Sequence, residues 1–187
     1  MSNVSKAVFL AAALGSLALA QDPRRPLLRV GVSVEMAGTQ HAVAMPQADE
    51  EDAQVVAVTI KGKVYLGVTP LSPAELPAKV QGGKPVYLKA DARASYSVVA
   101  AVLHALRQAG FSSVSLLTAQ QESPQPGLLV APKGLAVRLA PAAGAAAVEV
   151  HVRPAGSTAY GDVVRVIDAC RGAGAGVLLA SPGAVAK

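Results

Sequence analysis

The stretch KPVYLKADARASYSVVAAVLHALRQAGFSSVSLLT, residues 84–118, decides the fold of this chain. Apolar residues first alternate, and after a charged break they recur at three- and four-residue spacing from Val98 to Leu106, as on one face of a helix. Gly110 lies where the end of a helix requires a residue with a left-handed backbone conformation. A second apolar run begins at Val114. The pattern predicts a strand, a helix and a returning strand, which together form a βαβ unit of right-handed crossover.

The same pattern occurs a second time, 64 positions further along the chain (160 − 96). The segment VHVRPAGSTAYGDVVRVIDACRGAG, residues 150–174, aligns without a gap with VYLKADARASYSVVAAVLHALRQAG, residues 86–110. Among the matched pairs are Tyr96 with Tyr160, Val99 with Val163, Val102 with Val166, Arg107 with Arg171, and Gly110 with Gly174. Two copies are too few for a solenoid, so the repeat predicts a duplicated domain. The alternative is a chance resemblance between two segments rich in alanine and valine.

Composition limits the classes of function. The chain has 187 residues, of which 52% are hydrophobic and 3% aromatic, with a formal net charge of +5. Its basic residues are scattered and few aromatic residues lie among them, whereas a nucleic-acid binder needs a concentrated basic surface. We therefore expect no nucleic-acid partner. Cys170 is the only cysteine, so no intramolecular disulfide can form, and we expect a small buried hydrophobic residue there.

The first residues have the order of a secretory signal. Lys6 precedes the apolar run Ala7–Leu19, and Ala18-Leu19-Ala20 is a cleavage site of the A-x-A type. Residues 1–20 are thus predicted to be a signal peptide, or alternatively a short N-terminal anchor, although the run is shorter than the ~20 residues that span a bilayer. An exported, periplasmic protein beginning near Gln21 follows, anchored to the inner membrane if the signal is not cleaved.

Turn and cap residues divide the rest of the chain. Residues 21–28 read as a linker, 29–119 as a first α/β unit, 120–126 (QQESPQP) as a second linker, 127–181 as a shorter second unit, and 182–187 as a tail. Each unit is expected to be a two-layer α+β fold, with a βαβ core and helices on one face of a small sheet.

Further elements are expected around the two βαβ units. In the first, they are strands over Arg29–Glu35 and His41–Met45, a hairpin of Val55–Ile60 with Lys63–Leu66, and a short helix after Ser72. In the second, Leu128–Ala131 and Leu135–Leu139 are expected to form a hairpin about Pro132-Lys133-Gly134.

The residues that usually carry catalysis or bind metals are not arranged for either role. His41, His104 and His151 have no carboxylate at the spacing of a triad or a metal site. His104 aligns with Asp168, and both positions are interpreted as solvated. The acidic run from Asp49 to Asp52 lacks the alternating ligands and the glycine of a calcium loop, and is read as a solvated turn. No enzyme, catalytic residue, metal or cofactor is therefore expected.

Several segments in their order along the chain resemble the periplasmic domain of the ExbD/TolR biopolymer-transport family. They are VTIKGKVYLGVTPLSPAELPAKV, residues 58–80, followed by KPVYLKADARASYSVVAAVLHALRQAG, residues 84–110. The resemblance covers about residues 42–118, and residues 148–179 as a weaker second copy. In that family the domain hangs from one transmembrane helix that carries an aspartate essential for proton use. Here the apolar run Ala7–Leu19 contains no acidic residue, and a proton-driven complex needs such a buried carboxylate.

The resemblance implies a non-catalytic periplasmic protein that supports a TonB- or Tol-type transport complex by protein contacts. Its partners would be proteins like ExbB/TolQ, TonB or TolA. The alternative is a free-standing periplasmic module that binds peptidoglycan or protein. Asp91 and Tyr96, which flank the loop before the first helix, are predicted to form a partner-contacting edge; alternatively, Tyr96 packs in the core and Asp91 caps the helix.

Two structural expectations accompany this reading. Because family domains work as dimers, the two copies are expected to pack as an internal pseudo-dimer. Val102 and Val166 are expected to face inward, so that aspartate at either position unfolds its own copy.

Overall fold

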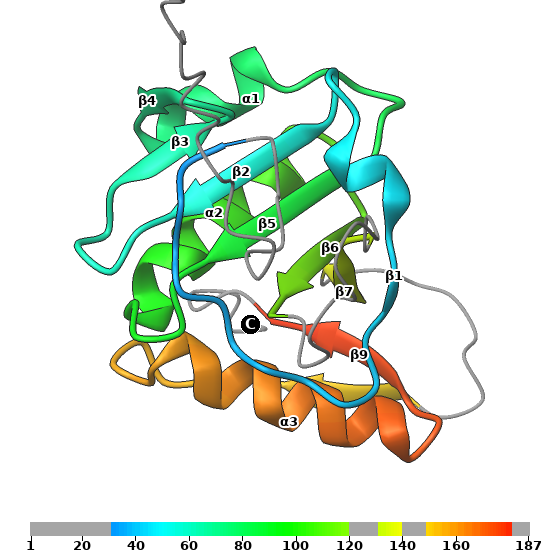
Figure 1. Ribbon diagram of the computed structural model, residues 1–187. Helices are drawn as coiled ribbons and strands as arrows, with labels where there is room; N and C mark the ends of the chain where they lie inside the picture. The colour runs from blue at the N-terminus through cyan, green and yellow to red at the C-terminus, as the bar shows by residue number, and fades with distance from the viewer. Residues whose placement is uncertain (1–30, 120–130, 140–148, 181–187) are drawn as a thin grey trace, which may run out of the picture.

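One mixed β-sheet runs through the protein. The computed structural model describes residues 31–119, 131–139 and 149–180. The sheet order is β4-β3-β2-β5-β6-β7-β9-β8, with β1 paired to β7 (Figure 1). The strands are β1 Val43–Ala44, β2 Gln54–Val58, β3 Val64–Leu66, β4 Thr69–Leu71, β5 Val86–Ala90, β6 Ser113–Thr118, β7 Lys133–Leu139, β8 Glu149–Val152 and β9 Gly176–Leu179. The helices are α1 Leu76–Lys79, α2 Tyr96–Gln108 and α3 Tyr160–Gly172, with 3-10 turns η1 Pro46–Asp49 and η2 Pro73–Glu75.

The first βαβ unit is formed as predicted. Strands β5 and β6 are parallel neighbours, with Leu88 opposite Leu116, and α2 connects them. Leu88, Leu103 and Leu106 are almost completely buried in the core that α2 shares with the sheet. Gly110 adopts a φ of 92°, the left-handed conformation that ends this helix.

The second βαβ unit is also present. Strands β8 and β9 are parallel, with Val150 opposite Val177, and α3 connects them. Helices α2 and α3 begin at Tyr96 and Tyr160, so the offset of the sequence match is also the offset of the helices. The predicted mixed α+β class is confirmed, but a single sheet contains both units. Strand β7 joins them, because it pairs antiparallel with β6 and parallel with β9.

The first unit carries additional outer strands and turns. Strand β2 pairs in parallel with β5 and antiparallel with β3, and the predicted hairpin turns at Gly62, where φ is 73°. The predicted start of the short helix at Ser72 is confirmed. There the Glu75 carboxylate accepts hydrogen bonds from the Ser72 backbone N–H and hydroxyl, each 2.7 Å long. This turn and α1 pack against α2.

Three predictions about strands and turns need correction. Residues 31–35 form no strand, and β1 keeps only two residues of the expected strand His41–Met45. The turn expected at Pro132-Lys133-Gly134 is replaced by strand β7, in which Gly134 lies opposite Leu117, and the expected strand Leu128–Ala131 lies outside the described residues except for Ala131. A Cβ atom at Gly134 would lie 2.6 Å from the Leu116 carbonyl oxygen and 2.7 Å from the Met45 sulfur. This glycine is therefore required by close packing and not by a turn.

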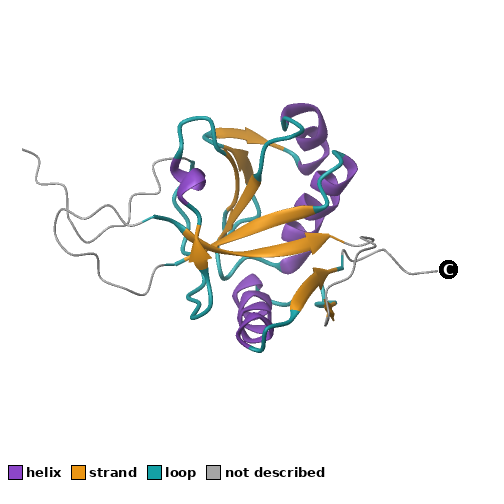
Figure 2. Ribbon diagram, turned by 90° about the vertical axis from the view of Figure 1, so that its right-hand side faces the viewer, coloured by secondary structure: helices purple, strands orange, loops and turns teal. Residues whose placement is uncertain are grey.

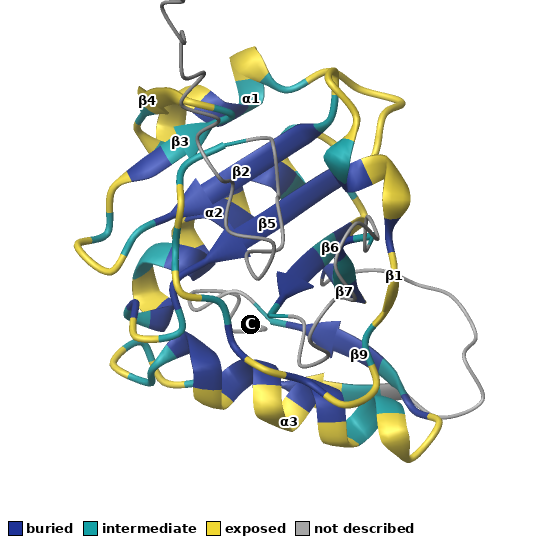
Figure 3. Cartoon of the chain, in the orientation of Figure 1, coloured by how far each residue is buried: buried dark blue, intermediate teal, exposed yellow. Residues whose placement is uncertain are grey.

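The central strands β2, β5 and β6 are covered on both faces of the sheet. The larger core lies between the sheet and helices α2 and α3, and Figure 2 shows the helices on that side. On the opposite face, Tyr87, Val55 and Leu117 pack with Met45 and Ala48 of the N-terminal segment. Buried residues follow β2 and β5 along their whole length and make up most of β6 (Figure 3). Strands buried on both faces need continuous apolar runs, which explains VVAV in β2.

Several sequence predictions fall outside the described residues. These are the signal peptide or anchor at 1–20, the linkers at 21–28 and 120–126, and the tail at 182–187. None of the helices in the described part of the chain has the length and apolar character needed to cross a bilayer.

Candidate partner-contact site

Residues 31–42 form an extended segment, here called the strap, that crosses the carboxyl ends of β5 and β6 and reaches α3 (Figure 1). The Ala92 N–H donates to the Glu35 carbonyl oxygen at 2.7 Å, and the Ala119 N–H donates to that of Ala37 at 2.8 Å. The strap thus contacts the first βαβ unit, and through Asp168 it also contacts the second.

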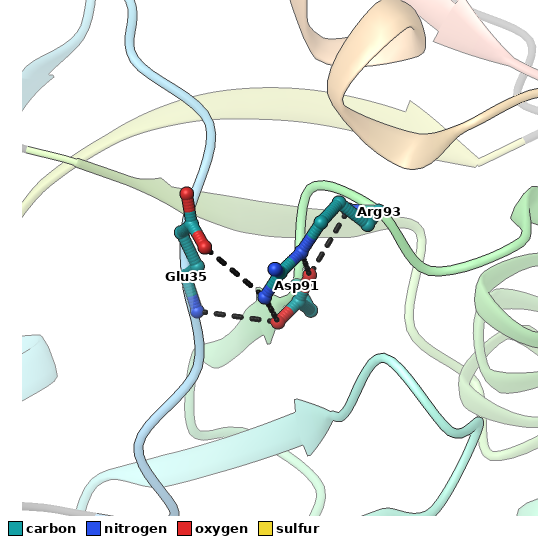
Figure 4. A network of polar contacts seen from close by, with 3 residues as sticks. All are labelled: Glu35, Asp91 and Arg93. Atoms are coloured by element: carbon teal, nitrogen blue, oxygen red, sulfur yellow. Dashed lines mark hydrogen bonds and ion pairs between the residues drawn. The ribbon is translucent and has the colours of Figure 1, made fainter.

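Asp91, one of the two predicted site residues, lies beneath the strap. Its side chain is 5% exposed and accepts hydrogen bonds from the Arg93 side chain at 3.0 and 3.1 Å and from the Arg93 backbone N–H at 3.0 Å (Figure 4). Arg93 also contacts the Glu35 carboxylate of the strap at 3.0 Å. The hydrogen bond from Arg93 lowers the pKa of Asp91 despite its burial. The exposed members of this network are Arg93 and Glu35, which cover Asp91.

Tyr96, the other predicted site residue, is completely buried at the start of α2. Its hydroxyl group donates to the Ala180 carbonyl oxygen at 3.2 Å, beyond the end of β9. The structure therefore places Tyr96 in the packing role that the sequence left as an alternative. Asp91 takes a related role, binding the backbone two residues ahead in the loop before α2. Contact of either residue with a partner stays a prediction.

The starts of α2 and α3 meet in a reciprocal set of backbone hydrogen bonds. The Tyr96 N–H donates to Thr158 and the Tyr160 N–H donates to Ala94, both at 2.9 Å, on either side of a bridge between Ser95 and Ala159. A second pair repeats the exchange: the Ser97 N–H donates to Gly156 at 2.9 Å, and the Gly161 N–H donates to Ala92 at 2.7 Å. Each bond has a counterpart with the roles of the two units exchanged. We call this contact the junction.

Asp168 is a structural site that sequence reasoning missed. Instead of facing solvent, its carboxylate accepts the backbone N–H groups of Gln40 and His41 at 2.9 and 2.8 Å and so holds the strap on α3. Burial alone would raise the pKa of Asp168, but these hydrogen bonds and the adjacent His41 imidazole lower it overall. No local sequence signal predicts this contact, because the two segments are far apart in the chain.

Val166 corrects another expectation. Its match to Val102 predicts a position on the inward face of the helix. In the structure, however, Val166 is 51% exposed, while Val102 is completely buried. The short helix α1 and the turn η2 pack on α2. The second unit has no corresponding elements among the described residues, so the same helix position faces solvent there.

No group of three or more His, Cys, Asp or Glu side chains in the described ranges could hold a metal ion. Lys89 is 4% exposed, and its burial lowers the pKa of the ammonium group, an effect that Asp49 partly offsets. The exposed charged residues Glu35 of the strap and Arg93 of the loop before α2 form an ion pair.

The family model described as biopolymer transport protein ExbD/TolR matches residues 27–122, about half of the chain. The chain belongs to the ExbD/TolR family. The match contains the first βαβ unit, its outer strands and the strap. Searches of curated proteins and of solved structures gave no match.

ExbD/TolR proteins are non-enzymatic accessory proteins of biopolymer transport that work with ExbB/TolQ and with TonB- or TolA-type partners. They are anchored in the membrane and carry a periplasmic domain. Family membership therefore gives this protein a role in biopolymer transport complexes and supports the prediction that it is no enzyme.

Proposed function

We propose that this protein is a non-catalytic, periplasmic ExbD/TolR-like protein that supports a TonB- or Tol-type complex by protein contacts. The observation that carries the proposal is the family match over residues 27–122, which contains the complete first βαβ unit and the strap that leads into it. The proposed contact site is the loop before α2, where Arg93 and Glu35 form the accessible surface above Asp91.

The proposed function has no proton-transfer step within this chain. The apolar run Ala7–Leu19 contains no carboxylate that could bind and release a proton at membrane depth. Residues 1–20 are proposed to act as the export signal, or as an anchor if they are retained. N-terminal sequencing of the mature protein distinguishes the two: a start at Gln21 supports export with cleavage, whereas an intact Met1 supports an anchor.

The test of the proposed function is a pull-down from envelope extracts. The wild-type protein should recover proteins like ExbB/TolQ, TonB or TolA, and Arg93→Glu should reduce their recovery. Lys61→Glu is the matched control, because Lys61 is an exposed lysine of the β2–β3 turn and takes no part in the hydrogen bonds and ion pairs that join Asp91, Arg93 and Glu35. Failure of the wild-type protein to recover any such component contradicts the proposal, and equal recovery by Arg93→Glu removes the loop before α2 as the contact site.

The alternative is a free-standing module that binds peptidoglycan. The positive formal net charge of +5 favours attraction to anionic polymers and is the observation behind this alternative. Co-sedimentation of the purified protein with sacculi would support it, and an absence of co-sedimentation removes it.

We further propose that the two βαβ units are duplicated copies, covering residues 29–119 and 127–181, that pack as an internal pseudo-dimer. The reciprocal hydrogen bonds at the junction support it, since an exchange of equivalent donors and acceptors is what a two-fold axis produces. Strand β7, which pairs with one strand of each unit, makes the symmetry approximate. A monomeric mass by sedimentation is expected, and a stable homodimer would contradict a pseudo-dimer complete in itself.

A further inference from the structure

We propose that the outer edge of β8, together with the adjacent exposed face of α3, binds an extended strand of a partner protein in which apolar and acidic residues alternate. The strand would add to the sheet in parallel with β8. This site lies outside the residues that the family model matches.

The first unit shows what such an edge accommodates. Strand β5 has β6 on one side and β2 on the other, and β2 runs parallel to β5 with Ala57 opposite Lys89. Strand β8 occupies the corresponding place in the second unit, with β9 on one side. Among the described residues, no strand lies on its other side, where the counterpart of β2 would be.

Backbone geometry shows which groups of β8 are available for pairing. In the first unit the Asp91 N–H donates to the Val58 carbonyl oxygen, so by alternation the backbone groups of Tyr87 and Lys89 also point toward β2. In the second unit the Ala180 N–H donates to Val152, so the even-numbered residues of β8 face β9. The backbone groups of His151 therefore point away from the sheet, as an edge strand requires to accept a partner.

The helix above this edge is also incompletely covered. Val102 and Ala105 are buried on α2, against which α1 and η2 pack, whereas the equivalent Val166 and Ala169 are exposed on α3. The exposed side of α3 is thus the side on which the first unit places its outer elements. A partner strand beside β8 would bring its apolar side chains beneath this face.

The side chains of β8 define the chemistry of the partner. Val152 is buried and Val150 is half-buried against the helix-side core, so the partner should be apolar on that side. His151 and Arg153 are exposed on the opposite side, and their positions correspond to Tyr87 and Lys89 of the first unit. Arg153 is positively charged and His151 can donate a hydrogen bond, a combination that favours carboxylates, so the partner should be acidic on that side.

The opposite edge strand of the sheet, β4, is less suited than β8 to bind a further strand. Strand β4 is the opposite edge, and it is three residues long with Pro70 at its centre. Proline on a short edge strand blocks the addition of a further strand. Strand β8 carries no proline from Glu149 to Val152.

The experiment uses the full chain and a short synthetic peptide that alternates valine and glutamate, measured by fluorescence anisotropy. The expected result is saturable binding that is lost when the peptide amides facing β8 are N-methylated, since methylation removes the ladder hydrogen bonds. In the double variant His151→Glu/Arg153→Glu, affinity should fall at least tenfold, and a peptide that alternates valine and lysine should bind instead. Both residues are exposed, so the variant should keep the fold, and circular dichroism checks this.

Lys61→Glu/Lys63→Glu is the control, because it also replaces two basic residues by glutamate, but on the β2–β3 hairpin. It should leave the affinity for the peptide unchanged. An absence of binding, or binding that survives N-methylation or the double variant, would overturn the proposal. The inference rests on the proposed function only in that the partner is a protein. The peptide assay contains no transport component, so failure of the envelope pull-down leaves its result intact, and the reverse also holds.

Discussion

Tyr96 and Tyr160 begin α2 and α3 at equivalent positions and are both completely buried. Burial raises the pKa of both phenols, so both remain neutral at physiological pH. They differ in their hydroxyl groups: that of Tyr96 donates to Ala180, whereas that of Tyr160 has no hydrogen-bond partner among the described residues. A buried hydroxyl group without a hydrogen-bond partner lowers the stability of the fold.

We predict opposite effects of removing the two hydroxyl groups. Tyr160→Phe should leave the free energy of unfolding unchanged or raise it, by up to about 1–3 kcal/mol, because it removes an unpaired buried polar group. Tyr96→Phe, the matched variant, should lower it by about 1 kcal/mol, because it removes the hydrogen bond to Ala180. Urea denaturation of the two variants measures the difference, and a larger loss for Tyr160→Phe would show that its hydroxyl group is paired.

Asp168 makes stability depend on pH in the acid range. Its carboxylate has a pKa below the ordinary value of 3.8, so its contribution to folding is present above that value and is lost as the pH falls through the lower folded pKa. We predict that Asp168→Asn lowers the free energy of unfolding at pH 7 by about 1–3 kcal/mol, because the strap loses a charged acceptor. Urea denaturation from pH 7 to pH 3 should also show a shallower acid loss than in wild type.

The control for that measurement is His104→Asn. His104 occupies the equivalent position on α2 and is exposed, without a bond to the strap. Its substitution should change neither the stability at pH 7 nor the acid slope. Parallel acid slopes for Asp168→Asn and wild type would contradict the assigned role of Asp168.

At the scale of elements, α2 and α3 have the same length but different surroundings. One side of α2 is covered by α1 and η2, whereas α3 is bound by the strap on another side through Asp168. Equivalent residues are therefore buried in one helix and exposed in the other. A repeat in sequence predicts equal elements, and the neighbours of each element decide which residues lie in the core.

We predict that Val102→Asp unfolds the protein at room temperature, because a completely buried position would receive an unpaired charge and lose more than about 4 kcal/mol. Val166→Asp should change the free energy of unfolding by less than about 0.5 kcal/mol, as is usual at exposed positions. Thermal melts followed by circular dichroism test both. Equal melting temperatures for the two variants would contradict the difference in helix burial.

At the scale of the whole molecule, the two βαβ units are joined by backbone pairing rather than by side-chain contact alone. Strand β7 pairs with β6 and β9 in one sheet, and the junction adds four backbone hydrogen bonds between the units. The strap adds further bonds to both. The units are therefore expected to unfold together and not one after the other.

We predict a single cooperative unfolding transition for the complete chain, with the same midpoint by circular dichroism and by tyrosine fluorescence. Tyrosines in both units, Tyr87 and Tyr160 among them, make the fluorescence sensitive to each. A fragment of residues 127–181 should not fold alone, because β7 would lose its partner β6. Two separated transitions, or a folded fragment, would contradict this prediction.

The sequence by itself determined the local elements and the family. Helical spacing from Val98 to Leu106, the glycine stop at Gly110 and the hairpin at Gly62 were all readable, because each depends on residues close together in the chain. The repeat offset was readable because two segments of the sequence align directly. The role of Gly134 was not readable, since a strand glycine that touches Met45 and a turn glycine look alike in sequence.

Only the tertiary structure decided how the two units share one sheet, where the strap runs, and which side of α3 is exposed. These features depend on contacts between residues far apart in the chain, such as Asp168 with Gln40 and His41 or β7 with β6 and β9. A hydrophobic pattern indicates that one face of a helix will be buried, but it does not indicate which other element covers that face. For that reason Val102 and Val166 match in sequence and differ in exposure.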